Sequence, residues 1–173
     1  MDADQLFYRA NVMADPGLMA YYDKVKVPAG EGLVFEGEVS TDYYMVHSGT
    51  LRVVEGTGEN AFTLATLEEG DVFGEISFFD GEARSATVRA EEDSVVLRMS
   101  RKKLVEILEK DPQLGINTLI ALGIRTASRV RDTTDMLAGV LGKKDVKENR
   151  ELSRLIKEVR TSAFGRPKWW QRS

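Results

Sequence analysis

The 173-residue sequence has no cysteine and one histidine, His47. Without cysteine the chain cannot form disulfide bonds or hold an iron–sulfur cluster through thiolates, and this composition fits the reducing cytoplasm, where we expect the protein to reside. A metal-dependent enzyme on a cupin-like barrel usually needs several histidines, so the single His47, expected on the surface, argues against that class. Because the sequence shows no nucleophile–histidine pair and no nucleotide-hydrolysing motif, we predict neither an enzyme nor a metal site.

Long apolar runs are also missing. No eighteen consecutive apolar residues occur, so we expect no transmembrane helix. The first ten residues, MDADQLFYRA, are acidic and lack the basic start and apolar core of a signal peptide. Hydrophobic residues make up 42% of the chain and charged residues 30%, a balance that allows a real core in a protein with no membrane contact.

Acidic residues are scarce at the C-terminal end. Residues 143–173 hold ten Lys/Arg and four Asp/Glu, a net charge of +6. Since the whole chain carries −4, the preceding 142 residues carry −10. A basic tail on an acidic body indicates two separate roles, and the tail suits an acidic protein partner or nucleic acid.

The region from residue 25 to residue 100 is typical of short β-strands. Apolar alternations such as 32–35 and 43–46 are separated by glycine turns, roughly every eight to twelve residues. Two more strands are expected within 88–99. The pattern predicts an α+β protein, mainly β, built on an eight-stranded antiparallel β-roll of the jelly-roll type.

Helices are expected on both sides of this region. Residues 2–22 have helical spacing, with a break at Pro16-Gly17. Residues 101–109 form a second helix, because Ser100 is a good N-cap. A short helical turn at 76–79 and one long C-terminal helix complete the predicted fold.

That long helix is expected to begin at Asp111-Pro112 and to extend to about Leu141, because Asp caps a helix and Pro suits its first position. Along it runs a stripe with alternating spacings of four and three: Leu119, Gly123, Thr126, Val130, Thr133, Leu137 and Val140. The stripe can pack on the helix's own β-roll, or it can form a parallel two-helix seam. We favour the seam, and hence a homodimer through residues 119–140.

The stretch 70–90, GDVFGEISFFDGEARSATVRA, brings together a glycine, a carboxylate, a guanidinium and hydroxyls. A backbone amide beside Gly74 can approach a phosphate closely, because no Cβ stands in the way, and a helical turn at 76–79 adds further amides. Arg84 can grip phosphate oxygens through two parallel hydrogen bonds, and Ser85 can donate a third. Glu75 would repel a phosphate, so we expect it to accept from a sugar hydroxyl, or to form a salt bridge with Arg84 when the site is empty.

These residues resemble the phosphate-binding cassette of the cyclic nucleotide-binding domain family, which includes bacterial catabolite activator proteins and the regulatory subunits of cyclic-AMP-dependent kinase. The segments Phe-Gly-Glu-Ile-Ser at 73–77 and Arg-Ser-Ala-Thr-Val at 84–88 match the cassette in order and spacing. Ala83 departs from the pattern, since many members carry Pro there. The resemblance covers about residues 25–141 and implies these ligand contacts: Phe73, Gly74, Glu75, Ile76, Ser77, Arg84, Ser85 and Ala86.

The long helix carries a second resemblance. In catabolite activator proteins, adjacent Thr and Ser hydroxyls reach the adenine across the dimer interface, and by that match Thr133 and Thr134 are candidates for reading the base. They lie about one helical turn farther from Pro112 than the family pattern implies. The alternative is that both are ordinary helix residues.

The resemblance implies a cyclic nucleotide-binding domain at 25–141. We expect an N-terminal helical segment (1–24) before it and, from the basic charge and helical spacing, a basic helical tail (142–173) after it. We predict a receptor for cyclic AMP or cyclic GMP that acts through the long helix and the tail on a protein partner. Cyclic AMP is favoured because Ser85 follows Arg84, as in bacterial cyclic-AMP receptors.

The alternative is a transcription regulator that binds DNA through the basic tail. Only thirty-one residues follow Gly142, fewer than the winged helix-turn-helix of such relatives needs, so the sequence does not favour DNA as a partner. A gel-shift assay over a salt series discriminates the two, because DNA binding weakens steeply with salt.

Overall fold

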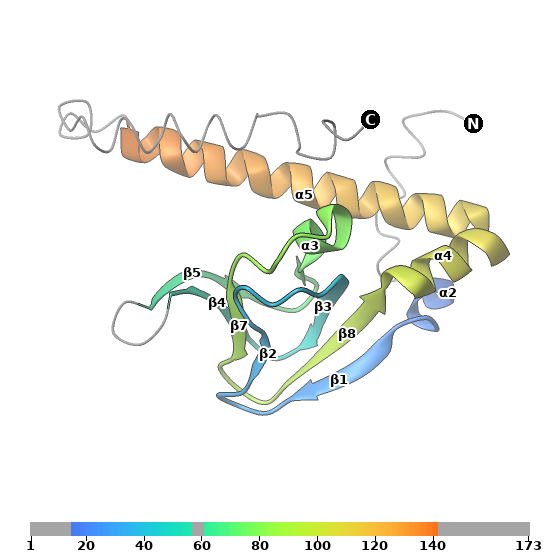
Figure 1. Cartoon of the computed structure of the whole chain (residues 1–173), viewed down its shortest axis with the longest axis horizontal. Helices are drawn as coiled ribbons and strands as arrows, with labels where there is room; N and C mark the ends of the chain where they lie inside the picture. The colour runs from blue at the N-terminus through green and yellow to red at the C-terminus, as the bar shows by residue number, and fades with distance from the viewer. Residues whose placement is uncertain (1–14, 57–60, 142–173) are drawn as a thin grey trace. The chain divides into compact units, whose positions relative to one another are not determined.

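A computed structural model describes residues 15–56 and 61–141, and the side-chain surroundings of these residues up to position 135 (Figure 1). The chain divides into two units, Met1–Ala127 and Ser128–Ser173. The helix predicted before residue 15 and the tail helix predicted after Gly142 lie outside the described residues. In chain order the elements are α2 (Pro16–Met19), β1 (Asp23–Val27), β2 (Gly32–Val34), β3 (Asp42–Ser48), β4 (Leu51–Glu55), β5 (Phe62–Leu67), β6 (Val72–Phe73), α3 (Glu75–Asp80), β7 (Thr87–Ala90), β8 (Ser94–Ser100), α4 (Arg101–Lys110) and α5 (Pro112–Leu141).

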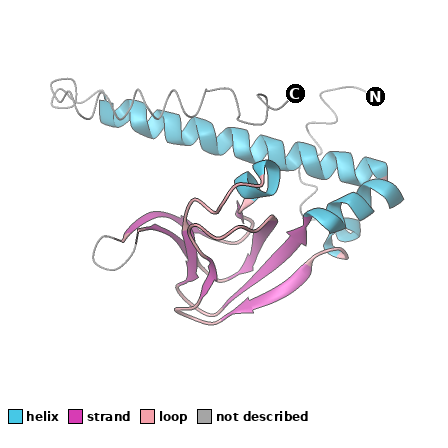
Figure 2. Ribbon diagram, in the orientation of Figure 1, coloured by secondary structure: helices cyan, strands magenta, loops and turns pink. Residues whose placement is uncertain are grey.

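The strands form two four-stranded sheets. Their orders are β1-β8-β3-β6 and β2-β7-β4-β5, and the paired strands run antiparallel. Each late strand, β7 or β8, therefore lies between two early strands, as in a jelly roll. Figure 2 shows that the strands form the body of the first unit, with α2, α3 and α4 along one side. The predicted eight-stranded antiparallel roll is confirmed.

The inside of the roll is apolar. Its buried side chains come from both sheets and include Val34, Leu51, Val88 and Val96. Along β7 the buried Val88 and Ala90 alternate with the more exposed Thr87 and Arg89, which is the period of two expected of a strand with one face in a core.

A second apolar cluster joins the first sheet to the helices. It contains Tyr43 and Leu97 from the sheet, Leu18 from α2, Ile107 from α4 and Leu122 from α5. The helices are therefore held on the roll by buried apolar area, the main source of stability in a domain of this size.

Side-chain caps fix where the helices begin. The Asp15 carboxylate accepts from the Gly17 and Leu18 amides, so Pro16 starts α2. The break predicted at Pro16-Gly17 is thus the start of a helix, because Pro is favourable at the first helical position. The Ser100 hydroxyl accepts from the Lys103 amide and begins α4, as predicted.

The part of helix α5 that belongs to the first unit, residues 112–127, packs on the roll. Thr118, Ala121 and Leu122 are buried, and Leu119 packs partly against the same cluster. Gly123, the next member of the predicted seam, is exposed. The face that contacts the roll therefore differs from the stripe predicted as a seam except at Leu119, and the homodimer through residues 119–140 stays a prediction.

A tyrosine pair connects the N-terminal part of this unit to the sheet. The hydroxyl oxygens of Tyr22 and Tyr43 lie 2.8 Å apart, and the Tyr43 ring makes an edge-to-face contact with Phe78 of α3 at a centroid distance of 5.0 Å. Burial raises the pKa of Tyr22 to about 12 and raises the pKa of Tyr43 further. The pair thus packs against the helix that bears much of the predicted cassette.

We expect this pair to make stability fall in alkali. The pKa of Tyr22 is about 12 in the folded protein and about 10 in an unfolded chain. The stabilisation is therefore complete below about pH 10 and is lost as the pH rises toward 12. Tyr22→Phe should flatten the fall in unfolding free energy by up to about 1.4 kcal/mol per pH unit. Denaturant unfolding at pH 9 and 11 measures this, with the partly exposed Tyr21 changed to Phe as control, and equal slopes for Tyr22→Phe and the wild type would contradict it.

Candidate functional site

The cassette region begins where a buried strand turns into a short helix. Strand β6 is followed by Gly74, whose φ of 78° lies in the left-handed region, and α3 starts at Glu75. A Cβ at Gly74 would lie 2.6 Å from Arg84 Nη1 and 3.0 Å from the Asp42 carbonyl oxygen. Both the backbone angle and the close approach therefore require glycine at this position.

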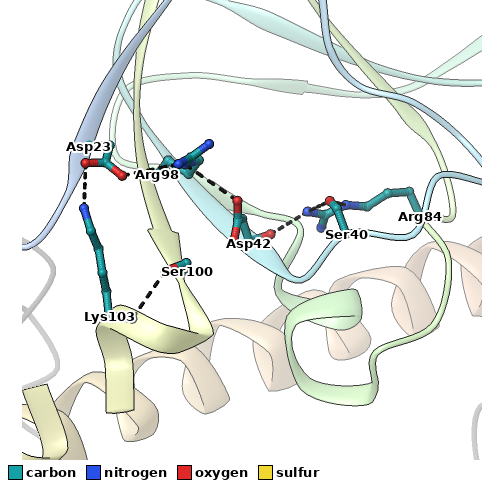
Figure 3. Close-up of polar contacts among 7 residues, drawn as sticks. All are labelled: Asp23, Ser40, Asp42, Arg84, Arg98, Ser100 and Lys103. Atoms are coloured by element: carbon teal, nitrogen blue, oxygen red, sulfur yellow. Dashed lines mark hydrogen bonds and ion pairs between the residues drawn. The ribbon is translucent and has the colours of Figure 1, made fainter. Parts of the chain in front are cut away.

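Arg84 lies directly against that glycine. Its Nη1 donates to the Gly74 carbonyl oxygen (2.9 Å) and its Nη2 to the Asp42 carbonyl oxygen (2.6 Å). The Ser40 hydroxyl oxygen accepts from both Nε (3.0 Å) and Nη2 (2.6 Å), as Figure 3 shows. The Tyr44 ring lies 5.8 Å from Arg84 Cζ. Sequence reasoning thus correctly placed Arg84 beside Gly74 at the start of the helical turn.

Arg84 is a buried cation that pairs with no carboxylate in the part of the chain that the structure describes. The residue is 4% exposed, and it forms no ion pair among the residues that the structure describes. The salt bridge predicted between Arg84 and Glu75 is therefore not formed. Because a buried charge is costly unless an opposite charge compensates it, this position favours an anion.

The other predicted cassette residues divide by exposure. Phe73, Glu75 and Ser77 are buried, and Phe73 stacks on Tyr44. Ile76 is 50% exposed and Ser85 is exposed.

Gly74 and Ala86 are partly exposed. The structure therefore brings 73–77 and 84–86 together at one corner of the roll. Of these residues, the exposed Ile76 and Ser85 are the most accessible to a solute.

Thr133 and Thr134 belong to the second unit. Both are exposed, and each hydroxyl donates to a carbonyl oxygen one turn earlier in its own helix, Arg129 at 2.8 Å and Val130 at 2.7 Å. These bonds occupy the hydroxyl protons, but the oxygen lone pairs can still accept. Their role in reading a base stays a prediction.

Sequence reasoning missed two groups that hold Arg84, the Ser40 side chain and the Asp42 carbonyl. They precede Arg84 by 44 and 42 positions. A backbone carbonyl has no residue signature, and one serine in a polar loop is not distinctive. The sequence contained no signal that could have found them.

It also missed Arg101, the first residue of α4. Its Nε donates to the Phe78 carbonyl oxygen (2.6 Å) and its Nη2 to that of Ser77 (3.4 Å), at the C-terminal end of α3. A cation there complements both the unpaired carbonyls and the helix dipole. Arg101 thus links the cassette helix to α4.

A chain of charged residues leads from Asp42, whose carbonyl oxygen accepts from Arg84, to Lys103 of α4 (Figure 3). The Asp42 carboxylate lies 3.6 Å from Arg98 Nε, Arg98 lies 3.5 Å from Asp23, and Lys103 donates to Asp23 at 2.6 Å. The hydrogen bond from Lys103 lowers the pKa of Asp23. These pairs are largely solvated, so each contributes little to stability.

A groove of about 590 Å³ lies elsewhere on the roll. Thr87 and Arg89 line it, and because Val88 and Ala90 point into the core, the groove is on the outer face of the second sheet. Arg84 and residues 73–77 do not line it, so among the cassette residues only Thr87 borders this groove.

In the described part of the chain, no three His, Cys, Asp or Glu side chains gather as a metal site would require. Within the same residues, no helix combines the length and apolar character needed to cross a bilayer.

Comparison with known proteins agrees with the geometry at Gly74 and Arg84. The family model described as "Cyclic nucleotide-binding domain" matches residues 24–111, which contain the whole cassette. The chain belongs to the cyclic nucleotide-binding domain family. Residues 73–77 and 84–86, which the sequence predicts as a phosphate-binding cassette, lie within the matched range.

Two relatives of this cyclic nucleotide-binding domain carry cyclic AMP in their names. It is 30% identical over 112 residues to the cyclic AMP receptor protein of Thermus thermophilus, covering 63% of this chain and 52% of the relative. It is 28% identical over 117 residues to the cAMP-activated global transcriptional regulator CRP of Escherichia coli O157:H7, covering 66% and 54%. The chain thus spans about half the length of each relative.

Solved structures show the same domain. A cyclic nucleotide-binding domain from Methylobacillus flagellatus matches with a TM-score of 0.67 at 28% identity, covering 74% of this chain and 73% of that one. The Thermus thermophilus catabolite activator protein matches with a TM-score of 0.57 at 28% identity, covering 79% and 60%.

Proposed function

We propose that this protein is a receptor for a cyclic mononucleotide, with cyclic AMP preferred to cyclic GMP. The buried Arg84 carries the proposal. Its guanidinium is held against Gly74 and has no ion pair among the described residues, so the phosphate of a cyclic nucleotide would supply the missing negative charge. The preference for cyclic AMP is supported by Ser85 after Arg84 and by the name of the Thermus thermophilus relative.

Each cassette group has a proposed role. Amides at 75–77 and the Arg84 guanidinium would contact the phosphate, and the exposed Ser85 hydroxyl would donate a further hydrogen bond. Glu75 is buried next to Gly74, where a carboxylate can accept from a ribose hydroxyl. Thr133 and Thr134 would face the base.

Binding would be transmitted along α5. Ligand can bias a switch only by its difference in affinity between two states, and α3 is linked by Arg101 to α4, which leads into α5. We propose a homodimer through residues 119–140 and a protein partner for 143–173.

Isothermal titration of the full chain with cyclic AMP, cyclic GMP and 5′-AMP tests the receptor function. We expect cyclic AMP to bind most tightly and 5′-AMP most weakly, because an uncyclised phosphate has a different shape and charge. A rise in the unfolding midpoint with ligand is the second readout, since a ligand that binds only the folded state stabilises it. Failure of both cyclic nucleotides to bind at millimolar concentration would refute the proposal.

A further inference from the structure

We infer that Ser40 is a positioning residue of the phosphate site, because it fixes the plane of the Arg84 guanidinium and determines which of its N–H groups a ligand meets. The inference rests on the proposed function. Ser40 lies in the loop between β2 and β3, far in sequence from the cassette, and is partly exposed. Among the described residues it is the one side chain that accepts a hydrogen bond from Arg84.

The hydrogen bonds of Arg84 within the protein use four of its five N–H groups. A guanidinium with its Nε has five N–H groups. The Ser40 hydroxyl oxygen accepts two of them, from Nε and Nη2, and the Asp42 and Gly74 carbonyls accept one each. One N–H, on Nη1, is left for a ligand oxygen.

The edge that Ser40 occupies is the one that matters for anions. Nε–H and Nη2–H point in parallel and form the fork that usually grips two oxygens of a carboxylate or phosphate. Ser40 fills this fork at 3.0 and 2.6 Å. The two parallel hydrogen bonds to phosphate predicted from the sequence would require Arg84 to leave Ser40, so we assign recognition to a fixed charge with one directed N–H.

The same loop also holds the Arg84 backbone. The Arg84 amide donates to the Glu38 carbonyl oxygen (2.8 Å), and the Gly37 amide donates to the Arg84 carbonyl oxygen (2.9 Å). The loop thus fixes the main chain of Arg84 and, through Ser40, the far end of its side chain. An arginine held at both ends loses little conformational freedom when an anion binds.

The opposite assignment is that Ser40 competes with the ligand for the fork. In that case removing the hydroxyl would free two N–H groups and tighten binding. The two assignments therefore predict affinity changes of opposite sign for Ser40→Ala.

The test uses three variants of the full chain, titrated with cyclic AMP. Ser40→Ala should weaken binding roughly three- to tenfold, the cost of ordering one long side chain at the moment of binding. Ser40→Thr keeps the hydroxyl and should stay within about twofold of the wild type. Ser48→Ala, at the exposed far end of β3, is the matched control and should change nothing.

A ligand-free measurement separates this inference from the proposed function. Nitrogen-15 NMR follows exchange of the Arg84 Nε–H with water, which should be slow in the wild type and Ser40→Thr and fast in Ser40→Ala. If the wild type bound neither cyclic nucleotide, the proposed function would fail, and the exchange rates would still decide whether Ser40 holds Arg84. Unchanged or tighter cyclic AMP binding by Ser40→Ala, or a slow Nε–H in that variant, would overturn the inference.

Discussion

Replacing Arg84 with alanine should weaken cyclic AMP binding by roughly 2–4 kcal/mol, about thirty- to several-hundred-fold. The variant loses a buried positive charge and the N–H directed at the phosphate. It also leaves the Gly74 and Asp42 carbonyls without the donor that joins them. Calorimetric titration measures the change.

Two further variants make the Arg84 result specific. Arg89→Ala removes an equal charge from the outer face of the same strand region, and it should change affinity by less than about twofold at physiological salt, because exposed charges are screened. Arg84→Lys keeps the charge but cannot span the three acceptors, so its affinity should lie between those of the wild type and Arg84→Ala. Equal losses in Arg84→Ala and Arg89→Ala would show that Arg84 acts only through long-range charge.

Gly74→Ala should abolish most cyclic AMP binding and also lower stability. A non-glycine residue at a φ of 78° costs about 1–2 kcal/mol. In addition, the new Cβ would lie 2.6 Å from Arg84 Nη1, so the guanidinium must shift away from the place where we propose the phosphate binds. We expect cyclic AMP affinity to fall by at least about tenfold, because the displaced guanidinium can no longer make a well-placed charged contact with the phosphate.

Gly30→Ala is the control that separates the effect of backbone strain from the effect of displacing the Arg84 guanidinium. Gly30 has a φ of 81°, but a Cβ there meets nothing within 4 Å. Both variants should therefore lower the unfolding midpoint, while only Gly74→Ala should lower affinity. If Gly30→Ala lost affinity as well, general destabilisation rather than Arg84 displacement would explain the effect.

The sequence predicted those parts of the fold that depend on interactions between residues close together in the chain. Glycine turns and alternating strands predicted the eight-stranded roll, and Ser100 and Asp111 marked where α4 and α5 begin, since a cap acts within three residues of its helix. The break predicted at Pro16-Gly17 coincides with the start of α2 for an equally local reason: Asp15 accepts from two amides and makes Pro16 the first helical residue.

The face of α5 that contacts the roll could not be obtained from periodicity. The stripe through Leu119 and Gly123 suggested one face, whereas Thr118, Ala121 and Leu122 make the contact with the roll. A helix with Gly, Ala and Thr on several faces shows more than one plausible stripe, and only packing selects the buried one.

The composition of the site can be predicted from the order of residues alone: a glycine, a carboxylate, an arginine and a serine, at a spacing that identifies the family. The way in which the arginine is held depends on the folded chain. Its acceptors are one serine and two backbone carbonyls, and Ser40 and Asp42 lie more than forty positions before it. Hydrogen bonds across such separations depend on how the strands and loops meet in space, and a carbonyl that every residue possesses leaves no trace in the order of side chains.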